Sequence, residues 1–270
     1  MNKKRILVPF DFTAAAESAA IVASSIALMS EMEITLIHVL GHDSESEADA
    51  QLSEMSKKIT ASSSAVCNYK IVKGKLFSEI TNEANDQVYK LMVIGSHGYK
   101  GIKEMFQGAD ILKLVKSIPV PVLVIQEGYE FPPEGIKTIL MPASSHDEFY
   151  KKIEAVVFLG RLFNSEVHVY TVEKPGFTWS ETMKLNIEKA IREFEAKGIK
   201  YKRVNESQTA YSPGYSKQIL QYAKKINAGM IAVMSVPTSE YYYIADSDKE
   251  RLLTNDLRIP VFAVSDTDRV

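Results

Sequence analysis

Short apolar runs alternate with amphipathic segments along the whole chain. In the first half, the runs that predict β-strands are Arg5–Pro9, Glu33–Leu40, Tyr69–Val72, Leu91–Gly95 and Val120–Gln126. The segments that predict helices are Ala14–Met29, Asp49–Ser63 after an acidic loop, Leu76–Val88 and Ala109–Ser117. The strand runs are almost continuously apolar, which is typical of strands buried on both faces of a parallel sheet. The pattern therefore predicts an α/β fold with helices on both faces of a sheet.

The second half of the chain repeats the first. Four strand-like runs return in the same order: Ile6–Pro9 as Ile139–Pro142, Ile37–Val39 as Val167–Val169, Leu91–Ser96 as Met230–Ser235, and Pro121–Ile125 as Pro260–Val264. We infer a duplication into two tandem, doubly wound domains, each with a five-stranded parallel sheet flanked by helices. The turn-forming segment Gly128–Gly135 separates them. We therefore expect domains over residues 1–127 and 136–270.

Composition narrows the classes of function. The 270 residues are 46% hydrophobic and 24% charged, with a formal net charge of −2. Lys and Arg are scattered, which argues against a nucleic-acid-binding face. The basic N-terminus lacks the long apolar run of a signal peptide, and no apolar stretch reaches the roughly 20 residues that span a bilayer. We therefore expect a cytoplasmic protein with no membrane contact.

Cysteine and histidine give no sign of metal or nucleophilic chemistry. Cys67 is the only cysteine, so the chain has no internal disulfide and no multi-thiolate site. It precedes a predicted strand and is expected to be structural. The five histidines, at 38, 42, 97, 146 and 168, show no metal-ligand spacing. His38 and His168 are expected at equivalent positions of the two halves.

The first half carries residues suited to a phosphate-bearing ligand. In open parallel sheets, ligands bind at the carboxyl ends of the strands, and Asp11 follows the first strand directly. The region after the fourth strand is rich in glycine and lysine: Gly95, Gly98, Lys100, Gly101, Lys103 and Gly108. Glycines let backbone amides approach phosphate oxygens, and the helix that follows adds unpaired N–H groups. Two alternatives remain open: Asp11 or its rival Thr13 caps the following helix, and the glycines form a flexible loop.

These residues resemble the universal stress protein family, over essentially the whole chain and twice. Ile6–Phe12 is similar to the family's first strand and its acidic residue. Gly95-Ser96-His97-Gly98, nine residues and then Gly108 is similar to the Gly-x-x-Gly-x9-Gly-Ser/Thr pattern of nucleotide-binding members. Pro121–Val124 resembles the family's last strand. The resemblance implies the adenine nucleotide alpha hydrolase-like fold, with the two halves pairing through their last strands as a pseudo-dimer. Further homodimerisation stays open.

The resemblance also implies an adenine nucleotide in the first half, with Mg²⁺ accompanying its phosphates. Asp11 would contact the adenine, Val39 would contact it through its backbone, and Gly98 and Gly108 would cradle the ribose and phosphates. The remaining candidates for ligand contact are Pro9, Gly95, His97, Ala109 and Asp110. Ala109 replaces the family's Ser or Thr, and losing that hydroxyl costs about 10- to 150-fold in affinity. Asp110 adds a repelling charge, so ATP, ADP and AMP all stay candidates.

The second half lacks these features. Ala143-Ser144 replace the acidic residue, and Ser235-Val236-Pro237-Thr238 replace the glycines. Tyr241–Tyr243 occupy the following loop and are expected to pack at an interface between the halves or between copies of the chain; the alternative is a stacking surface for a ligand. We therefore expect one nucleotide site, no catalytic residue, and a stress-response or regulatory protein. The alternatives are an interaction scaffold without nucleotide, and a very slow ATPase.

Overall fold

A computed structural model describes residues 3–41, 44–97, 108–173, 178–207, 215–236 and 246–269. The first half contains β1 (Arg5–Pro9), α1 (Ala14–Ser30), β2 (Glu33–Leu40), α2 (Glu45–Ser63), β3 (Cys67–Lys73), α3 (Leu76–Ala84), β4 (Tyr89–Ser96), α4 (Gly108–Ser117) and β5 (Val122–Gln126). The second half contains β6 (Thr138–Pro142), α5 (Phe149–Phe163), β7 (Glu166–Glu173), α6 (Glu181–Lys197), β8 (Lys200–Ser207), α7 (Tyr215–Lys225), β9 (Met230–Met234), α8 (Asp246–Leu253) and β10 (Val261–Val264). The predicted α/β class with two tandem domains is confirmed.

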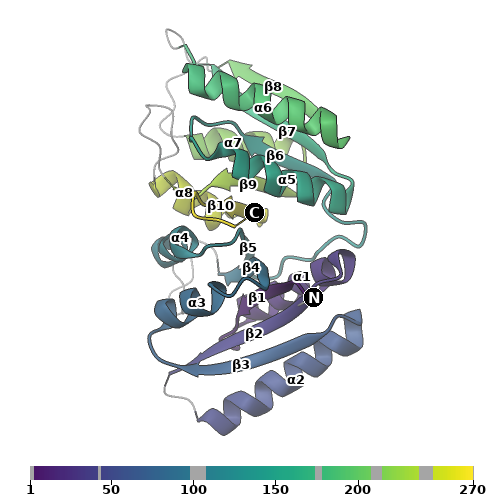
Figure 1. Ribbon diagram of the computed structural model, residues 1–270, viewed down its shortest axis with the longest axis vertical. Helices are drawn as coiled ribbons and strands as arrows, with labels where there is room; N and C mark the ends of the chain where they lie inside the picture. Colours follow the sequence, from purple (N-terminus) through teal and green to yellow (C-terminus); the bar gives the residue numbers. More distant parts are fainter. Residues whose placement is uncertain are drawn as a thin grey trace.

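The two halves share one ten-stranded sheet (Figure 1), in the order β3-β2-β1-β4-β5-β10-β9-β6-β7-β8. At the junction, β5 and β10 run antiparallel, with Val122 opposite Ala263 and Val124 opposite Val261. The other strand pairs in the described residues are parallel. The predicted pairing of the two halves through their last strands is therefore confirmed. Pro121 and Pro260 precede these strands, where a missing N–H costs no ladder bond.

Apolar side chains form one core layer on each face of this sheet. One layer packs beneath α1, α2, α5 and α6, and the other beneath α3, α4, α7 and α8. The outermost strands, β3 and β8, carry polar residues at positions that are apolar in the central strands. This difference follows from their place at the sheet edges, because each has a neighbouring strand on one side only.

Polar contacts tie the two halves together beside the β5–β10 pair. Helices α4 and α8 pack against each other, and Lys116 forms a 2.7 Å ion pair with Asp246. Gln126 donates a 2.8 Å hydrogen bond to the Leu253 carbonyl. Near the C-terminus, Arg269 donates to the carbonyls of Ala84 and Asn85 at the end of α3. A cation at that place complements the helix dipole.

Several element boundaries differ from the predicted ones. Helix α2 begins at Glu45 instead of Asp49, because Ser44 caps it and the acidic residues that we assigned to a loop favour a first helical turn. Helix α3 ends at Ala84 instead of Val88, where Arg269 binds its last carbonyls. Cys67 lies inside β3 and is buried. Burial raises the pKa of its thiol to about 11, in agreement with a structural role.

The predicted equivalence of His38 and His168 is wrong. Glu33 pairs with Arg5 at the start of β1, and Glu166 pairs with Thr138 at the start of β6. Counted from these pairs, His168 corresponds to Thr35, three residues before His38. An odd shift along a strand moves a side chain to the opposite face of the sheet. The two histidines therefore lie in different core layers, and their apparent match reflects only the similarity of short apolar runs.

Candidate functional site

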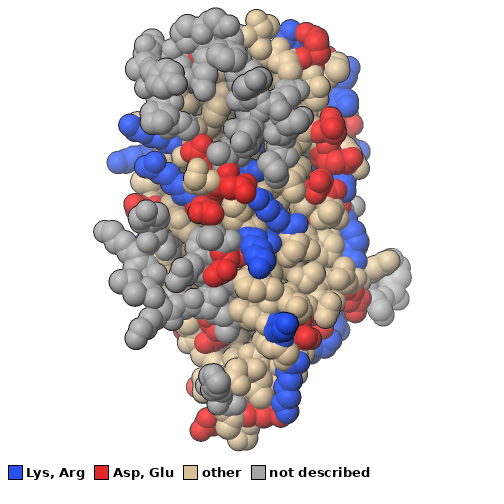
Figure 2. Space-filling view, turned by 90° about the vertical axis from the view of Figure 1, so that its left-hand side faces the viewer, with Lys and Arg blue, Asp and Glu red and all other residues tan. Residues whose placement is uncertain are grey.

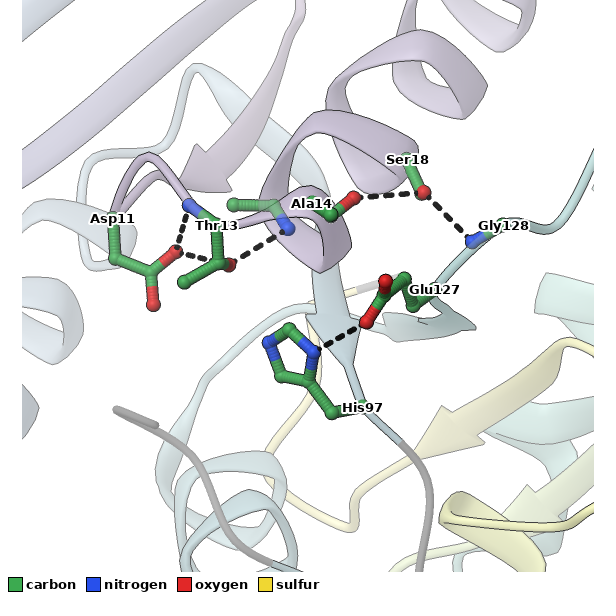
Figure 3. Close-up of polar contacts among 8 residues, drawn as sticks. Asp11, Thr13, Ala14, Ser18, His97, Glu127 and Gly128 are labelled. Atoms are coloured by element: carbon green, nitrogen blue, oxygen red, sulfur yellow. Dashed lines mark hydrogen bonds and ion pairs between the residues drawn. The ribbon is translucent and has the colours of Figure 1, made fainter. Parts of the chain in front are cut away.

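The start of α1 holds Asp11 in a defined position (Figure 3). Thr13 is the N-cap, and its Oγ1 accepts a 3.2 Å hydrogen bond from the Ala16 amide. Asp11 Oδ1 accepts from the Thr13 amide at 3.2 Å and from the Thr13 hydroxyl at 2.6 Å. Thr13 is thus the cap, and Asp11 supports it. Among the described residues, Asp11 Oδ2 has no hydrogen-bond partner, so this oxygen is available to a ligand.

Phe12, between these two residues, has φ = 64°, in the left-handed region that a side chain disfavours. Its ring packs edge-on against Phe10, with 5.5 Å between the ring centroids, and at a tilt against His38, with 4.6 Å between the centroids. His38 Nδ1 donates a 2.8 Å hydrogen bond to the Phe10 carbonyl. Aromatic packing therefore holds the unusual backbone and fixes the turn that presents Asp11.

Asp11 lines a hollow at the carboxyl ends of β1 and β4. The other lining residues are Pro9, Thr13, Ala16, Ile94, Gly95 and His97. The enclosed volume of this hollow is only about 10 Å³. This is far below the roughly 300–1,000 Å³ of typical ligand pockets, so the described residues form one wall of a nucleotide-sized site and do not enclose it.

Gly95 allows α1 to lie directly against β4 beside this hollow. A Cβ at Gly95 would come within 2.3 Å of the Ala15 carbonyl carbon and oxygen. No rotamer change can relieve a clash with backbone atoms. Gly95 is therefore required by the packing of the fold, whether or not a ligand also needs it.

His97 is oriented by a carboxylate that sequence reasoning missed. Its Nδ1 donates a 2.7 Å hydrogen bond to Glu127 Oε2 (Figure 3), which fixes the orientation of the ring. The next residue, Gly128, donates its amide to the Ser18 hydroxyl at 3.0 Å. Glu127 follows β5 and lies beside His97 because β4 and β5 are neighbours. No local motif could have indicated this pair.

The remaining predicted site residues are placed as follows. Gly108 and Ala109 begin α4, and half-buried Asp110 lies in its first turn. Val39 lies inside β2, its side chain packs in the core layer beneath α3 and α4, and it is not among the residues that line the hollow. Gly98 lies outside the described residues, as do Lys100, Gly101 and Lys103. The structure therefore brings Pro9, Asp11, Gly95 and His97 together and leaves the glycine loop untested.

Charges of both signs are mixed on the described part of the face that Figure 2 shows. Within the described ranges, no three His, Cys, Asp or Glu side chains gather in a way that could hold a metal ion. No helix among the described residues is long and apolar enough to cross a membrane.

In the second half, the residues that follow β6 form hydrogen bonds with one another, and a hollow remains beside Pro142 and Ala143 at the carboxyl ends of β6 and β7. Ser144 lies two residues after β6, as Asp11 does after β1, and its hydroxyl bonds His146 Nδ1 at 2.9 Å. His146 Nε2 donates to the Val236 carbonyl at 2.7 Å, and the buried Lys249 ammonium donates to the same oxygen. Burial lowers the pKa of His146 to about 4, so this ring is neutral at neutral pH.

A second buried lysine extends this hydrogen-bonded cluster. Lys152 Nζ donates a 2.7 Å hydrogen bond to the carbonyl of Pro142, the last residue of β6. Counted back from the helix C-caps Asn164 and Glu31, Lys152 corresponds to Ala19 on the buried face of α1. The sequence signal that could have indicated this cluster is a lysine among the apolar positions of α5. The expectation that the second half binds no nucleotide stays a prediction. The loop residues Tyr241–Tyr243 and the residue His42 lie outside the described residues.

The comparisons with known proteins agree with this architecture. Residues 2–126 match the model described as the universal stress protein family. A universal stress protein from Archaeoglobus fulgidus DSM 4304 has a TM-score of 0.72 at 19% identity, covering 98% of this chain and 100% of its own. A putative universal stress protein from Pseudomonas aeruginosa UCBPP-PA14 has a TM-score of 0.62 at 18% identity, covering 97% and 93%. At these identities the two structures are evidence for the fold alone. No curated protein matches the sequence.

Proposed function

Since the N-terminal half of this chain belongs to the universal stress protein family and the C-terminal half repeats its fold, we propose that the protein binds one adenine nucleotide, in its N-terminal half. The observation that carries this proposal is Asp11, which lines the hollow with one carboxylate oxygen fixed by Thr13 and the other without a partner among the described residues. A carboxylate oxygen is a suitable acceptor for the exocyclic amine of adenine.

The phosphates are proposed to lie toward the start of α4. Gly98 and Gly108 would supply backbone donors there, and the helix N-terminus adds partial positive charge. Ala109 offers no hydroxyl and Asp110 repels a terminal phosphate, so AMP or ADP is held as well as ATP. Mg²⁺ would accompany the longer nucleotides. His97, oriented by Glu127, is the described side chain best placed to donate to the ribose or phosphate.

The proposed role is that of a cytoplasmic stress-response or regulatory protein without fast turnover. Occupancy of the first site would change a surface that protein partners read. The second half, in which Lys152, His146 and Lys249 form hydrogen bonds with backbone carbonyls, supports the first through the β5–β10 pair. We propose domain limits at residues 1–127 and 136–270, with the segment between them as the linker.

We expect Asp11→Ala to weaken adenine nucleotide binding by about 10- to 150-fold, because a hydrogen bond to a charged group contributes about 1.5–3 kcal/mol. Isothermal titration calorimetry with ATP, ADP, AMP and adenosine measures this effect and the stoichiometry, expected to be one per chain. Asp256→Asn is the control, since Asp256 is exposed and forms no hydrogen bond or ion pair with another described residue. Equal affinity of wild type and Asp11→Ala would contradict the proposal.

Two measurements test the alternatives, an interaction scaffold without nucleotide and a very slow ATPase. Mass spectrometry of small molecules released from the purified protein, combined with the titrations, tests whether the protein is a scaffold that binds no nucleotide. Absence of any bound adenylate in both experiments would favour it. Phosphate release at high protein concentration tests the slow ATPase. Hydrolysis that Asp11→Ala leaves unchanged would not come from this site.

A further inference from the structure

A second hollow lies in the C-terminal half, between the β7–β8 face of the sheet and the start of α6. Its volume is about 300 Å³, against about 10 Å³ for the hollow beside Asp11. Its apolar wall is formed by Val169, Ile187 and the indole of Trp179. This volume lies at the lower end of the roughly 300–1,000 Å³ range of small-molecule sites. We call it the Trp179 hollow.

Polar side chains line this hollow where the first half has apolar ones. Arg203 lies opposite Val169 in the β7–β8 ladder. At the corresponding place in the β2–β3 ladder, Tyr69 lies opposite Leu36 and packs against the core. Two pairs further along the strands, and on the same face, Asn205 lies opposite Thr171, where the first half places Ile71 opposite His38. Arg203 and Asn205 are exposed although they line the hollow, so both side chains can contact a ligand that enters it.

The polar groups that line the hollow form hydrogen bonds with one another or with the backbone, with the exception of Arg203. Thr171 Oγ1 donates to Asn205 Oδ1 at 3.3 Å, and Asn205 Nδ2 donates to Glu173. Trp179 Nε1 donates to the Val172 carbonyl at 3.4 Å. Arg203 makes no hydrogen bond or ion pair with any described residue, although it carries five donors. The guanidinium is therefore the lining group available to a ligand, and it binds carboxylates in a bidentate manner.

We propose that the Trp179 hollow binds a small aromatic monocarboxylate. The ring lies against Trp179 and Ile187, where aromatic stacking and apolar burial stabilise it. The carboxylate accepts two hydrogen bonds from Arg203. A single carboxylate fits better than a phosphate dianion, because Glu173 supplies a negative charge at the same rim. This site is separate from the proposed nucleotide site.

Trp179 is the only tryptophan of the chain, so its fluorescence reports on this hollow directly. We expect phenylacetate to change the emission of the full-length protein in a saturable manner. Phenylacetamide, which has the same ring without the charge, and acetate, which has the charge without the ring, are expected to bind about tenfold more weakly or less. Calorimetric titration with the same compounds detects binding that leaves the emission unchanged.

Arg203→Gln is expected to weaken phenylacetate binding about tenfold or more and to remove the preference over the amide. Arg192→Gln is the matched control, because Arg192 is exposed on α6 and does not line the hollow. Asp11→Ala is expected to leave phenylacetate binding unchanged, which separates this site from the nucleotide site. The proposal is overturned if neither method detects phenylacetate binding, if the amide binds as tightly as the acid, or if Arg203→Gln binds like wild type.

Discussion

Gly95→Ala is expected to reduce the free energy of unfolding by about 3 kcal/mol or more, or to prevent folding of the N-terminal half. The added methyl group would stand 2.3 Å from the Ala15 carbonyl carbon and oxygen, and 2.8 Å from the Ala16 amide nitrogen. These are backbone atoms of α1, so the helix itself must move away from β4. The helix also carries Thr13, and its displacement would release Asp11. The variant is therefore expected to lose nucleotide binding as well.

Urea unfolding followed by circular dichroism measures this change. Gly41→Ala is the matched control, because no atom lies within 4 Å of a Cβ built at Gly41. Its stability is expected to stay within about 0.5 kcal/mol of wild type. A Gly95→Ala protein that unfolds like wild type would show that α1 and β4 do not approach as closely as described. Gly95→Ala changes the packing of the fold and the candidate nucleotide site at the same time. Asp11→Ala is therefore the specific test of nucleotide binding.

Lys152 is expected to make stability rise with pH above neutrality. Its side chain is buried, and loss of hydration lowers the pKa of the ammonium from 10.5 to about 7. Between these values the unfolded chain binds a proton at Lys152 that the folded chain does not. The free energy of unfolding therefore increases as pH rises through this window. Lys249, whose pKa burial lowers to about 8, contributes in the same direction above that pH.

Lys152→Met removes this contribution while keeping an unbranched chain of similar length. Between about pH 7 and pH 9, stability of the wild type is expected to rise by about 1–3 kcal/mol more than that of the variant. The range stops at pH 9 because the raised pKa of Cys67 opposes the trend above it. Lys189→Met, at an exposed position of α6, is expected to follow the wild-type profile. Parallel profiles for wild type and Lys152→Met would contradict the described burial.

Part of the candidate site could be predicted from the sequence. Asp11 could be placed because it directly follows an apolar strand, and a strand end in a parallel sheet is a binding edge. Gly95 and His97 followed from the spacing of the glycine motif. Glu127 could not be identified, because its contact with His97 depends on the neighbouring positions of β4 and β5. Arg203 was missed for the same reason, since the space between α6 and the β7–β8 face does not show in any local pattern.

The sequence alone determined the class of fold, the duplication and the order of the elements, because apolar periodicity and turn-forming residues act over short stretches of chain. The sequence did not determine how the strands of the two halves align residue by residue. Short apolar runs match equally well at several shifts, and for this reason the predicted equivalence of His38 and His168 is wrong. Tertiary structure decided which side chains meet, namely His97 with Glu127 and Lys152 with the Pro142 carbonyl. Such contacts join residues far apart in the chain, and only the packing of strands and helices brings them within hydrogen-bonding distance.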